Sequence, residues 1–339
     1  MRNCAILIAL LAALLAYPAH ADAAGRKGSG SVRFRDGQAR SDKITVRLTK
    51  ATPPAGGYHY EAWLISDDGQ THIDIGQLNL DAEGSALLDW VSPGGENLLG
   101  RYDRFAISEE ANGAGASAPS NRIAYAGQAA PELRAAMLSL LVAGPDTPLP
   151  DRVGLATGLR VEARALASEG RRALNAALEL RLATRRNQDE ALLNRLAGIN
   201  DRLWGDWDGD GKIEYASDTY GITRYARTVQ QTIQPLLGQP TLNQDQQALL
   251  NEMLTATNNI LDWAYQTRNL ANVVVSPNTD TEAAKVVQSD VAWLTNITSR
   301  GADLTNDGKI ELELGEGGAD GIYTNAQDMG RISFKAVKS

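Results

Sequence analysis

The chain has 339 residues, of which 43% are hydrophobic and 22% are charged, and this composition is typical of a globular protein. Its length suits two ordinary domains. The formal net charge of −8 argues against nucleic acid and anionic membrane as partners, because both require clustered basic charge.

Residues 1–21 are predicted to be a secretory signal peptide. Arg2 supplies the charged start, Ala5–Ala16 is a short apolar run, and small residues allow cleavage after Ala21 or Ala23. The apolar run is too short to span a bilayer comfortably. The single cysteine precedes this run, so the mature chain has none and cannot form disulfides. We therefore expect a secreted or periplasmic protein with no membrane insertion after signal cleavage.

Residues 29–128 show a sequence pattern typical of β-strands. Short segments rich in Val, Ile, Tyr and Trp are separated by turn signals such as Asp68-Gly69 and Glu83-Gly84. Seven strands at this spacing predict an N-terminal antiparallel β-sandwich. The predicted strands are Ser31–Arg35, Ile44–Leu48, Tyr58–Ile65, Ile73–Leu80, Ala86–Trp90, Arg104–Ser108 and Arg122–Tyr125.

Several motifs of this segment occur together. They are Tyr60-Glu61-Ala62-Trp63-Leu64, Asp68-Gly69, Gly76-Gln77-Leu78, Asp81-Ala82-Glu83-Gly84, Phe105-Ala106-Ile107-Ser108-Glu109-Glu110 and Pro119-Ser120-Asn121-Arg122. With them the segment resembles the extracytoplasmic C-terminal domain of anti-sigma-K-type factors. In that family a membrane helix and a sigma-binding module precede this domain, and we expect neither here. The resemblance therefore implies a sandwich outside the membrane and no sigma factor as partner.

Residues 131–334 are predicted to form an all-α bundle that begins after a domain boundary near Ala129. Apolar residues recur there with the 3.6-residue period of a helix, and alanine is plentiful. One periodic segment runs from Leu155 as far as Leu203. The other predicted helices are Glu132–Val142, Tyr220–Leu237, Asn243–Val275, Thr281–Ile297 and Ile322–Met329.

The first of two acidic loops, residues 206–218, lies between predicted helices. Aspartates stand at positions 1, 3 and 5, and Gly211 at position 6 permits the sharp turn of an EF-hand-type calcium loop. Position 12 is Ser217 instead of the usual Glu, so we expect Asp218 to close the loop. The predicted ligands are Asp206, Asp208, Asp210, the carbonyl of Lys212, Glu214 and Asp218.

The second loop, residues 303–316, repeats this frame. Both loops contain the string Asp-Gly-Lys-Ile-Glu, but Thr305 replaces the second aspartate here, and Glu316 is the expected closing acid. Two such loops predict two calcium sites, because calcium prefers six to eight oxygen ligands. The alternative is a pair of solvated acidic turns. The predicted ligands are Asp303, Thr305, Asp307, the carbonyl of Lys309, Glu311 and Glu316.

With these two loops, residues 131–330 resemble a group of exported bacterial proteins that join such a sandwich to an α-helical domain with EF-hand-like loops. The matching strings are Asp-Gly-Asp-Gly followed by Asp218, and Asp-Gly-Lys-Ile-Glu followed by Gly-Glu-Gly-Gly. The resemblance implies calcium binding and no particular activity.

Catalytic patterns are scarce in this sequence. Only His59 and His72 remain after signal removal, and neither a nucleophile elbow nor a phosphate-binding glycine loop is present. We therefore expect a non-enzymatic, calcium-stabilised module of the cell surface or envelope that binds a protein or glycan. The alternative is a hydrolase of cell-wall or polysaccharide material with calcium as scaffold. A cleft with two close carboxylates of unequal pKa would favour that alternative.

Overall fold

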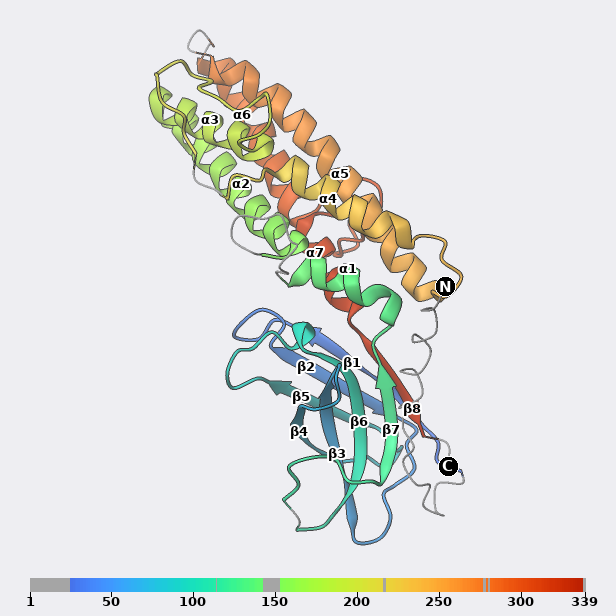
Figure 1. Ribbon diagram of the computed structural model, residues 1–339. Coiled ribbons are helices and arrows are strands. Elements are labelled where there is room, and N and C mark those ends of the chain that lie inside the picture. The colour runs from blue at the N-terminus through green and yellow to red at the C-terminus, as the bar shows by residue number, and fades with distance from the viewer. Residues whose placement is uncertain are drawn as a thin grey trace, which may run out of the picture.

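The structure is a computed structural model that describes residues 25–113, 115–142, 153–215, 218–276, 279 and 281–337. The predicted signal peptide, residues 1–21, lies outside the described residues. Within the described part, eight strands form one antiparallel sheet, and seven α-helices stand at one end of it (Figure 1). The expectation of a mixed β and α fold is therefore confirmed.

All seven predicted strands are present, with ends within a few residues of the predicted ones. Alternation directs their packing: Val32 and Phe34 of the first strand are fully buried, whereas Arg33 between them is exposed. The strands are β1 (Ser29–Arg35), β2 (Lys43–Thr49), β3 (Tyr58–Ser66), β4 (His72–Leu78), β5 (Ala86–Val91), β6 (Tyr102–Ala111) and β7 (Ile123–Gln128).

The sheet has an eighth strand that the sequence analysis did not predict. This strand, β8 (Ile332–Ala336), comes from the C-terminal end of the chain and lies between β7 and β1. The order of the sheet is β4-β3-β6-β7-β8-β1-β2-β5, and its two edge strands, β4 and β5, contact each other. The result is a curled eight-stranded sheet and not a clear seven-stranded sandwich.

Phe334 fixes β8 in the middle of the sheet. Its side chain is buried, and its ring packs against Phe105 with centroids 4.8 Å apart. Gly30 of β1 and Gly127 of β7 flank it, and a Cβ added to Gly30 would lie 2.3 Å from Cζ of the Phe334 ring. A Cβ added to Gly127 would lie 2.8 Å from Phe334 Cβ. These two glycines therefore make room for Phe334, Gly30 for its ring and Gly127 for its Cβ.

The helical half contains the predicted helices with one clear difference. The periodic segment that was expected to run to Leu203 divides into two helices, and the second ends at Ala197 because Gly198 has a φ of 81°. The helices are α1 (Pro131–Leu141), α2 (Leu155–Leu178), α3 (Leu182–Ala197), α4 (Ile222–Ile233), α5 (Gln244–Val275), α6 (Thr281–Arg300) and α7 (Ala319–Met329). Short 3₁₀ turns occupy Leu98–Gly100 and Gln234–Leu236.

Polar contacts join the helices to the sheet where α7 precedes β8. Arg35 of β1 donates two hydrogen bonds to Asp328 of α7, at 2.9 and 2.8 Å. Arg160 of α2 bridges Asp320 of α7 at 2.8 Å and Asp36 after β1 at 3.0 Å. A single cluster of buried hydrophobic residues continues from the sheet into the helices. Helix α7 is therefore attached to both halves of the molecule.

No helix among the described residues is long and apolar enough to cross a membrane.

Candidate metal centre

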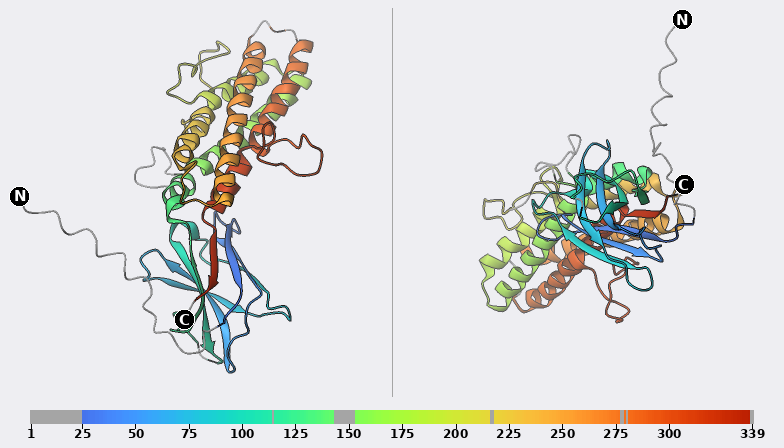
Figure 2. Two further views of the ribbon diagram at one scale, coloured as in Figure 1. Left: turned by 90° about the vertical axis from the view of Figure 1, so that its right-hand side faces the viewer. Right: turned by 90° about the horizontal axis from the view of Figure 1, so that it is seen from below.

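The two acidic loops both connect consecutive helices, and each has a glycine-rich base. Loop 1, residues 206–218, lies between α3 and α4, and loop 2, residues 303–316, lies between α6 and α7 and projects from the bundle (Figure 2). At the base of loop 1, a Cβ on Gly198 would lie 2.4 Å from the Tyr220 carbonyl oxygen. At the base of loop 2, a Cβ on Gly301 would lie 2.3 Å from the Glu316 carbonyl oxygen. Glycine thus lets the two ends of each loop meet.

The first aspartate of loop 1 organises the turn as the sequence predicts. Asp206 accepts hydrogen bonds from the backbone N–H of Gly209 at 2.7 Å and of Gly211 at 2.9 Å. Both glycines have a positive φ, 76° at Gly209 and 86° at Gly211. Asp210 accepts from the N–H of Lys212 at 2.9 Å. The front half of the loop is therefore a series of tight turns with its carboxylates on one side.

Loop 2 has the same arrangement at the same positions. Asp303 accepts from the N–H of Gly308 at 2.9 Å, as Asp206 does from Gly211. Asn306 and Gly308, at positions 4 and 6, have φ values of 58° and 85°. Asp307 accepts from the N–H of Lys309 at 2.9 Å. The two loops are therefore structural repeats over their first seven positions.

Glu316 lies inside loop 2, where the sequence placed the closing acid. Its side chain is buried and accepts three backbone N–H groups, those of Leu304 at 3.0 Å, Thr305 at 3.1 Å and Glu311 at 3.2 Å. These residues hold positions 2, 3 and 9 of the loop. Burial and the hydrogen bond with Glu316 raise the pKa of the Glu311 carboxyl.

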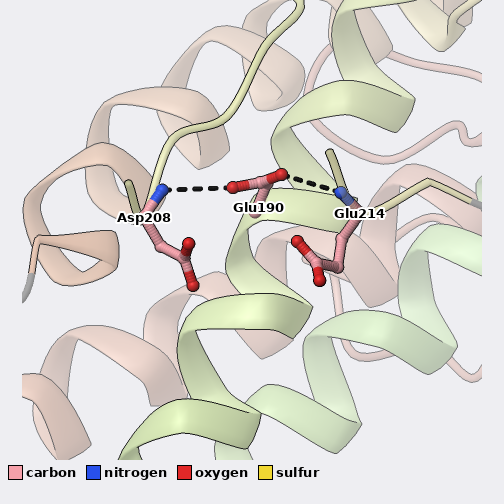
Figure 3. A group of neighbouring side chains, drawn as sticks. All are labelled: Glu190, Asp208 and Glu214. Atoms are coloured by element: carbon pink, nitrogen blue, oxygen red, sulfur yellow. Dashed lines mark hydrogen bonds between the residues drawn. The ribbon is translucent and has the colours of Figure 1, made fainter. Parts of the chain in front are cut away.

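The acid inside loop 1 is Glu190 of α3, which the sequence analysis did not consider. It is fully buried and accepts the N–H of Trp207 at 2.7 Å, Asp208 at 3.1 Å and Glu214 at 2.7 Å. These are again positions 2, 3 and 9. Figure 3 shows Asp208 and Glu214 on either side of Glu190. The one sequence signal was a carboxylate in the apolar stretch that precedes the loop.

Carboxylates of loop 1 gather into two overlapping groups. One group consists of Asp206, Asp208 and Asp210, and the other consists of Glu190, Asp208 and Glu214. Within each group, one carboxylate oxygen of each residue lies within 4.8 Å of those of the other two. Burial raises the pKa of Glu190. The three N–H groups that it accepts act in the opposite direction, and the charge of Glu214 adds to the rise. A cation would relieve this repulsion.

Glu214 offers an oxygen that has no partner among the described residues. Its Oε1 accepts from Asn187 Nδ2 at 2.9 Å, whereas its Oε2 is buried and accepts no hydrogen bond from that part of the chain. A buried carboxylate oxygen without a partner is costly, so this atom fits a metal ligand. The predicted ligands Asp206, Asp208 and Asp210 therefore lie close together, and Glu214 lies close to Asp208.

Asp218, which the sequence analysis expected to close loop 1, faces helix α4. Its carboxylate accepts the hydroxyl of Tyr225 and, at 3.0 Å, the N–H of Tyr220. Tyr225 is fully buried, and burial together with Asp218 raises the pKa of its hydroxyl. Among the described residues, neither carboxylate group of loop 1 includes Asp218. The buried hydroxyl of Tyr225 needs an acceptor, and Asp218 serves as that acceptor and not as a member of the carboxylate groups.

Loop 2 gathers fewer charges than loop 1. No residue between 303 and 316, all of which are described, belongs to a group of three close carboxylates. The hydroxyl of Thr305 donates to Asp303 at 3.4 Å, where loop 1 has the carboxylate of Asp208. Lys309 Nζ also lies 3.9 Å from Asp307. Loop 2 is therefore the weaker candidate of the two.

A separate carboxyl pair lies on the sheet. Burial raises the pKa of Glu61 in β3 to about 8, and a hydrogen bond with Asp74 of β4 and the charge of Glu110 add to the rise. His59 Nε2 lies 3.1 Å from Glu61 Oε2. His72 pairs with Ile65 at the other end of β3, so His59 and His72 lie apart.

Comparison with protein-family models, curated proteins and solved structures finds no match to this chain. The two resemblances described from the sequence therefore stay predictions, and the function rests on the geometry of the two loops.

Proposed function

We propose that the protein is an exported calcium-binding protein and that each acidic loop holds one calcium ion. The observation that carries the proposal is the repeated scaffold. In both loops a buried glutamate accepts the N–H groups of positions 2, 3 and 9, and the aspartate at position 1 accepts the N–H of the position-6 glycine. Two chain segments that share the string Asp-Gly-Lys-Ile-Glu are held in one shape by glutamates from different parts of the chain, which is expected of two sites for one ligand.

Calcium fits the donor set of these loops. The available side-chain donors are carboxylate oxygens, with one threonine hydroxyl in loop 2, and calcium prefers six to eight such hard ligands. Asp206, Asp208 and Asp210 are close enough to bind one ion, and Glu214, which lies close to Asp208, has a buried oxygen without a hydrogen-bond partner among the described residues. In loop 2 the corresponding ligands would be Asp303, Thr305, Asp307 and Glu311. No thiolate or imidazole lies in either loop, which disfavours zinc.

The role of calcium that we propose is mainly structural. Loop 2 leads directly into α7, which forms ion pairs with Arg35 and Arg160 and continues into β8. An ion that holds loop 2 therefore stabilises the point where the helices and the sheet are connected. Extracellular calcium modules bind at about 10⁻⁴–10⁻³ M and meet nearly constant calcium, so a stabilising role suits an exported protein.

We further propose a binding role at the cell surface or envelope, with a protein or glycan ligand, over the alternative of polysaccharide hydrolysis. The carboxylates of glycoside hydrolases stand about 5 Å or more apart so that a sugar fits between them. Glu61 and Asp74, the carboxyl pair with a raised pKa on the sheet, hydrogen-bond to each other instead. This contact supports the binding role.

Terbium luminescence tests the proposal. Trp207 at position 2 of loop 1 should sensitise bound terbium, whereas residues 303–316 contain no aromatic side chain. We expect a signal that calcium displaces, and we expect Asp206→Asn to remove most of it. Asp262→Asn, an exposed change on α5 far from both loops in sequence, is the matched control and should leave the signal intact. An unchanged signal in Asp206→Asn would overturn the assignment of loop 1.

A further inference from the structure

Two adjoining pockets lie beside loop 1, between the segment that follows α3 and helices α4 and α5. One has a volume of about 340 Å³ and the other of about 190 Å³. They share Ala197, Asp201, Thr223 and Arg227 as lining residues. Together they form one continuous depression, which we call the arginine groove.

Three arginines line the arginine groove without acidic partners. Arg224 and Arg227 of α4 are exposed, and Arg268 of α5 is partly buried. Among the described residues none of the three forms an ion pair, in a protein whose formal net charge is −8. By contrast, Arg160, Arg164 and Arg172 of α2 and Arg195 of α3 are paired with carboxylates. The groove therefore gathers three guanidinium groups that have no carboxylate partner among the described residues.

Two of the three arginines lie against aromatic rings. The guanidinium of Arg224 lies 4.3 Å from the ring centroid of Tyr220, and that of Arg268 lies 5.0 Å from the ring centroid of Tyr265. Stacking leaves the N–H edges of a guanidinium free to bind an anion, because the ring contacts only its face. Arg224 and Arg268 are therefore oriented before any ligand arrives.

The groove also offers an apolar surface. Leu196, Leu261 and Ala264 line the smaller pocket, and the ring of Tyr265 is 56% exposed beside them. The one carboxylate in the lining, that of Asp201, accepts the N–H of Leu203 at 2.9 Å. Three guanidinium groups against one carboxylate leave the groove locally positive.

We propose that the arginine groove binds an acidic carbohydrate. Guanidinium groups bind carboxylate and sulfate groups with two parallel hydrogen bonds, and an exposed tyrosine ring offers a flat face for the C–H side of a sugar ring. Volumes of about 340 and 190 Å³ exceed what a single ion fills and suit a sugar. A carboxylated and a sulfated sugar share this chemistry, and the experiment below distinguishes them.

Carbohydrate binding in the arginine groove does not require calcium in loop 1, although the groove and the loop lie beside each other. The segment that lines the groove is fixed by backbone hydrogen bonds, from Ile199 N–H to Thr219 at 3.0 Å and from Trp204 N–H to Asp201 at 3.0 Å. Terbium titration of the same sample reports the loops separately. A failure of metal binding and a failure of carbohydrate binding are therefore distinguishable.

Isothermal titration calorimetry of the mature chain with a hyaluronan hexasaccharide, which carries carboxylates alone, is the central experiment. The matched probe is the same hexasaccharide with its carboxylates methyl-esterified, and a heparin hexasaccharide tests sulfate. We expect the acidic sugar to bind and the ester to bind at least about tenfold more weakly. Binding of the heparin fragment alone would keep the proposal and identify sulfate as the recognised group.

Variants locate the binding to the groove. Arg227→Ala should lower the affinity about tenfold, and Arg227→Lys should lower it less because the charge remains. Arg171→Ala, an exposed change on α2 outside the groove, should stay within about twofold of the native chain. Equal affinity for the esterified sugar would overturn the proposal, as would native affinity in both Arg224→Ala and Arg227→Ala. Binding of a hexaglutamate peptide with no binding of either acidic sugar would also overturn it.

Discussion

Glu190 and Glu316 accept backbone N–H groups from the same three positions of their respective loops, although Glu190 precedes loop 1 on helix α3 and Glu316 closes loop 2. Each carboxylate is buried, and each ties the two arms of its loop together. The loops are therefore held in one shape by acids from different parts of the chain.

Replacing either glutamate should destabilise the protein by a similar amount. Glu190→Ala and Glu316→Ala each leave three backbone N–H groups without their acceptor, so we expect a loss of about 1–3 kcal/mol in the free energy of unfolding. Urea denaturation followed by circular dichroism measures it. Asp218→Asn, whose side chain keeps an acceptor for Tyr225, is the comparison and should cost less. A larger loss in Asp218→Asn than in Glu190→Ala would show that loop 1 depends on Asp218.

The two loops should differ in affinity, and Thr305 is the reason. Loop 1 has the carboxylate of Asp208 where loop 2 has a hydroxyl, and an added charged ligand strengthens calcium binding. We expect Thr305→Asp to raise the calcium affinity of loop 2 and Asp208→Thr to lower that of loop 1. Calorimetric titration resolves the two sites. The hypothesis is wrong if Thr305→Asp leaves the weaker site unchanged.

Removal of calcium should weaken the sheet as well as the helices. At a hundredfold excess over its dissociation constant, a ligand of the folded state adds about 2.7 kcal/mol of stability. Calcium in loop 2 should stabilise the sheet as well, because loop 2 leads into α7 and α7 leads into β8, which lies between β7 and β1. We expect EDTA to lower the melting temperature and to speed amide hydrogen exchange in β1, β7 and β8. Unchanged exchange in these strands would show that the sheet is stable without loop 2.

The central position of β8 depends on Phe334. Phe334→Ala removes a buried ring that packs against Phe105 and should cost about 3–5 kcal/mol of unfolding free energy. Lys335→Ala, the next residue on the exposed face of the same strand, is the matched control and should stay within about 0.5 kcal/mol of the native chain. Chemical denaturation compares the two variants. Equal costs would mean that β8 contributes no packing.

Glu61 should make the protein less stable as the pH rises through neutrality. Its pKa is about 8 in the folded protein, above the ordinary value of 4.5, so the folded state binds the proton more tightly. The loss of unfolding free energy caused by Glu61 is absent below about pH 4.5, where the carboxyl is protonated in both the folded and the unfolded state. The loss grows as the pH rises toward 8, because the unfolded state releases the proton more readily than the folded state. Glu61→Gln should gain stability relative to the native chain by at least about 1.4 kcal/mol at pH 9 and little at pH 4. A gain that does not depend on pH would contradict this.

Local pattern determined much of this protein. The seven strands follow from alternation with turn residues between them, and most helices follow from apolar periodicity, because both signals come from residues close in sequence. The turns of the two loops are equally local: Asp206 and Gly211, like Asp303 and Gly308, are five residues apart and hydrogen-bond to each other. Sequence alone therefore predicted where the loops lie and which front-half carboxylates they present.

Tertiary structure decided what lies inside the loops and what completes the sheet. Glu190 reaches loop 1 because α3 packs beside it, and Asp218 faces α4 because it accepts the buried hydroxyl of Tyr225. Strand β8 lies between β7 and β1 although the whole helical half separates it from β7 in the sequence. No local pattern around Gly30 or Gly127 indicates that these glycines lie beside Phe334. Arg227 and Arg268 meet in one groove because α4 packs on α5. All of these contacts join residues far apart in the chain, and sequence periodicity carries no information about such pairs.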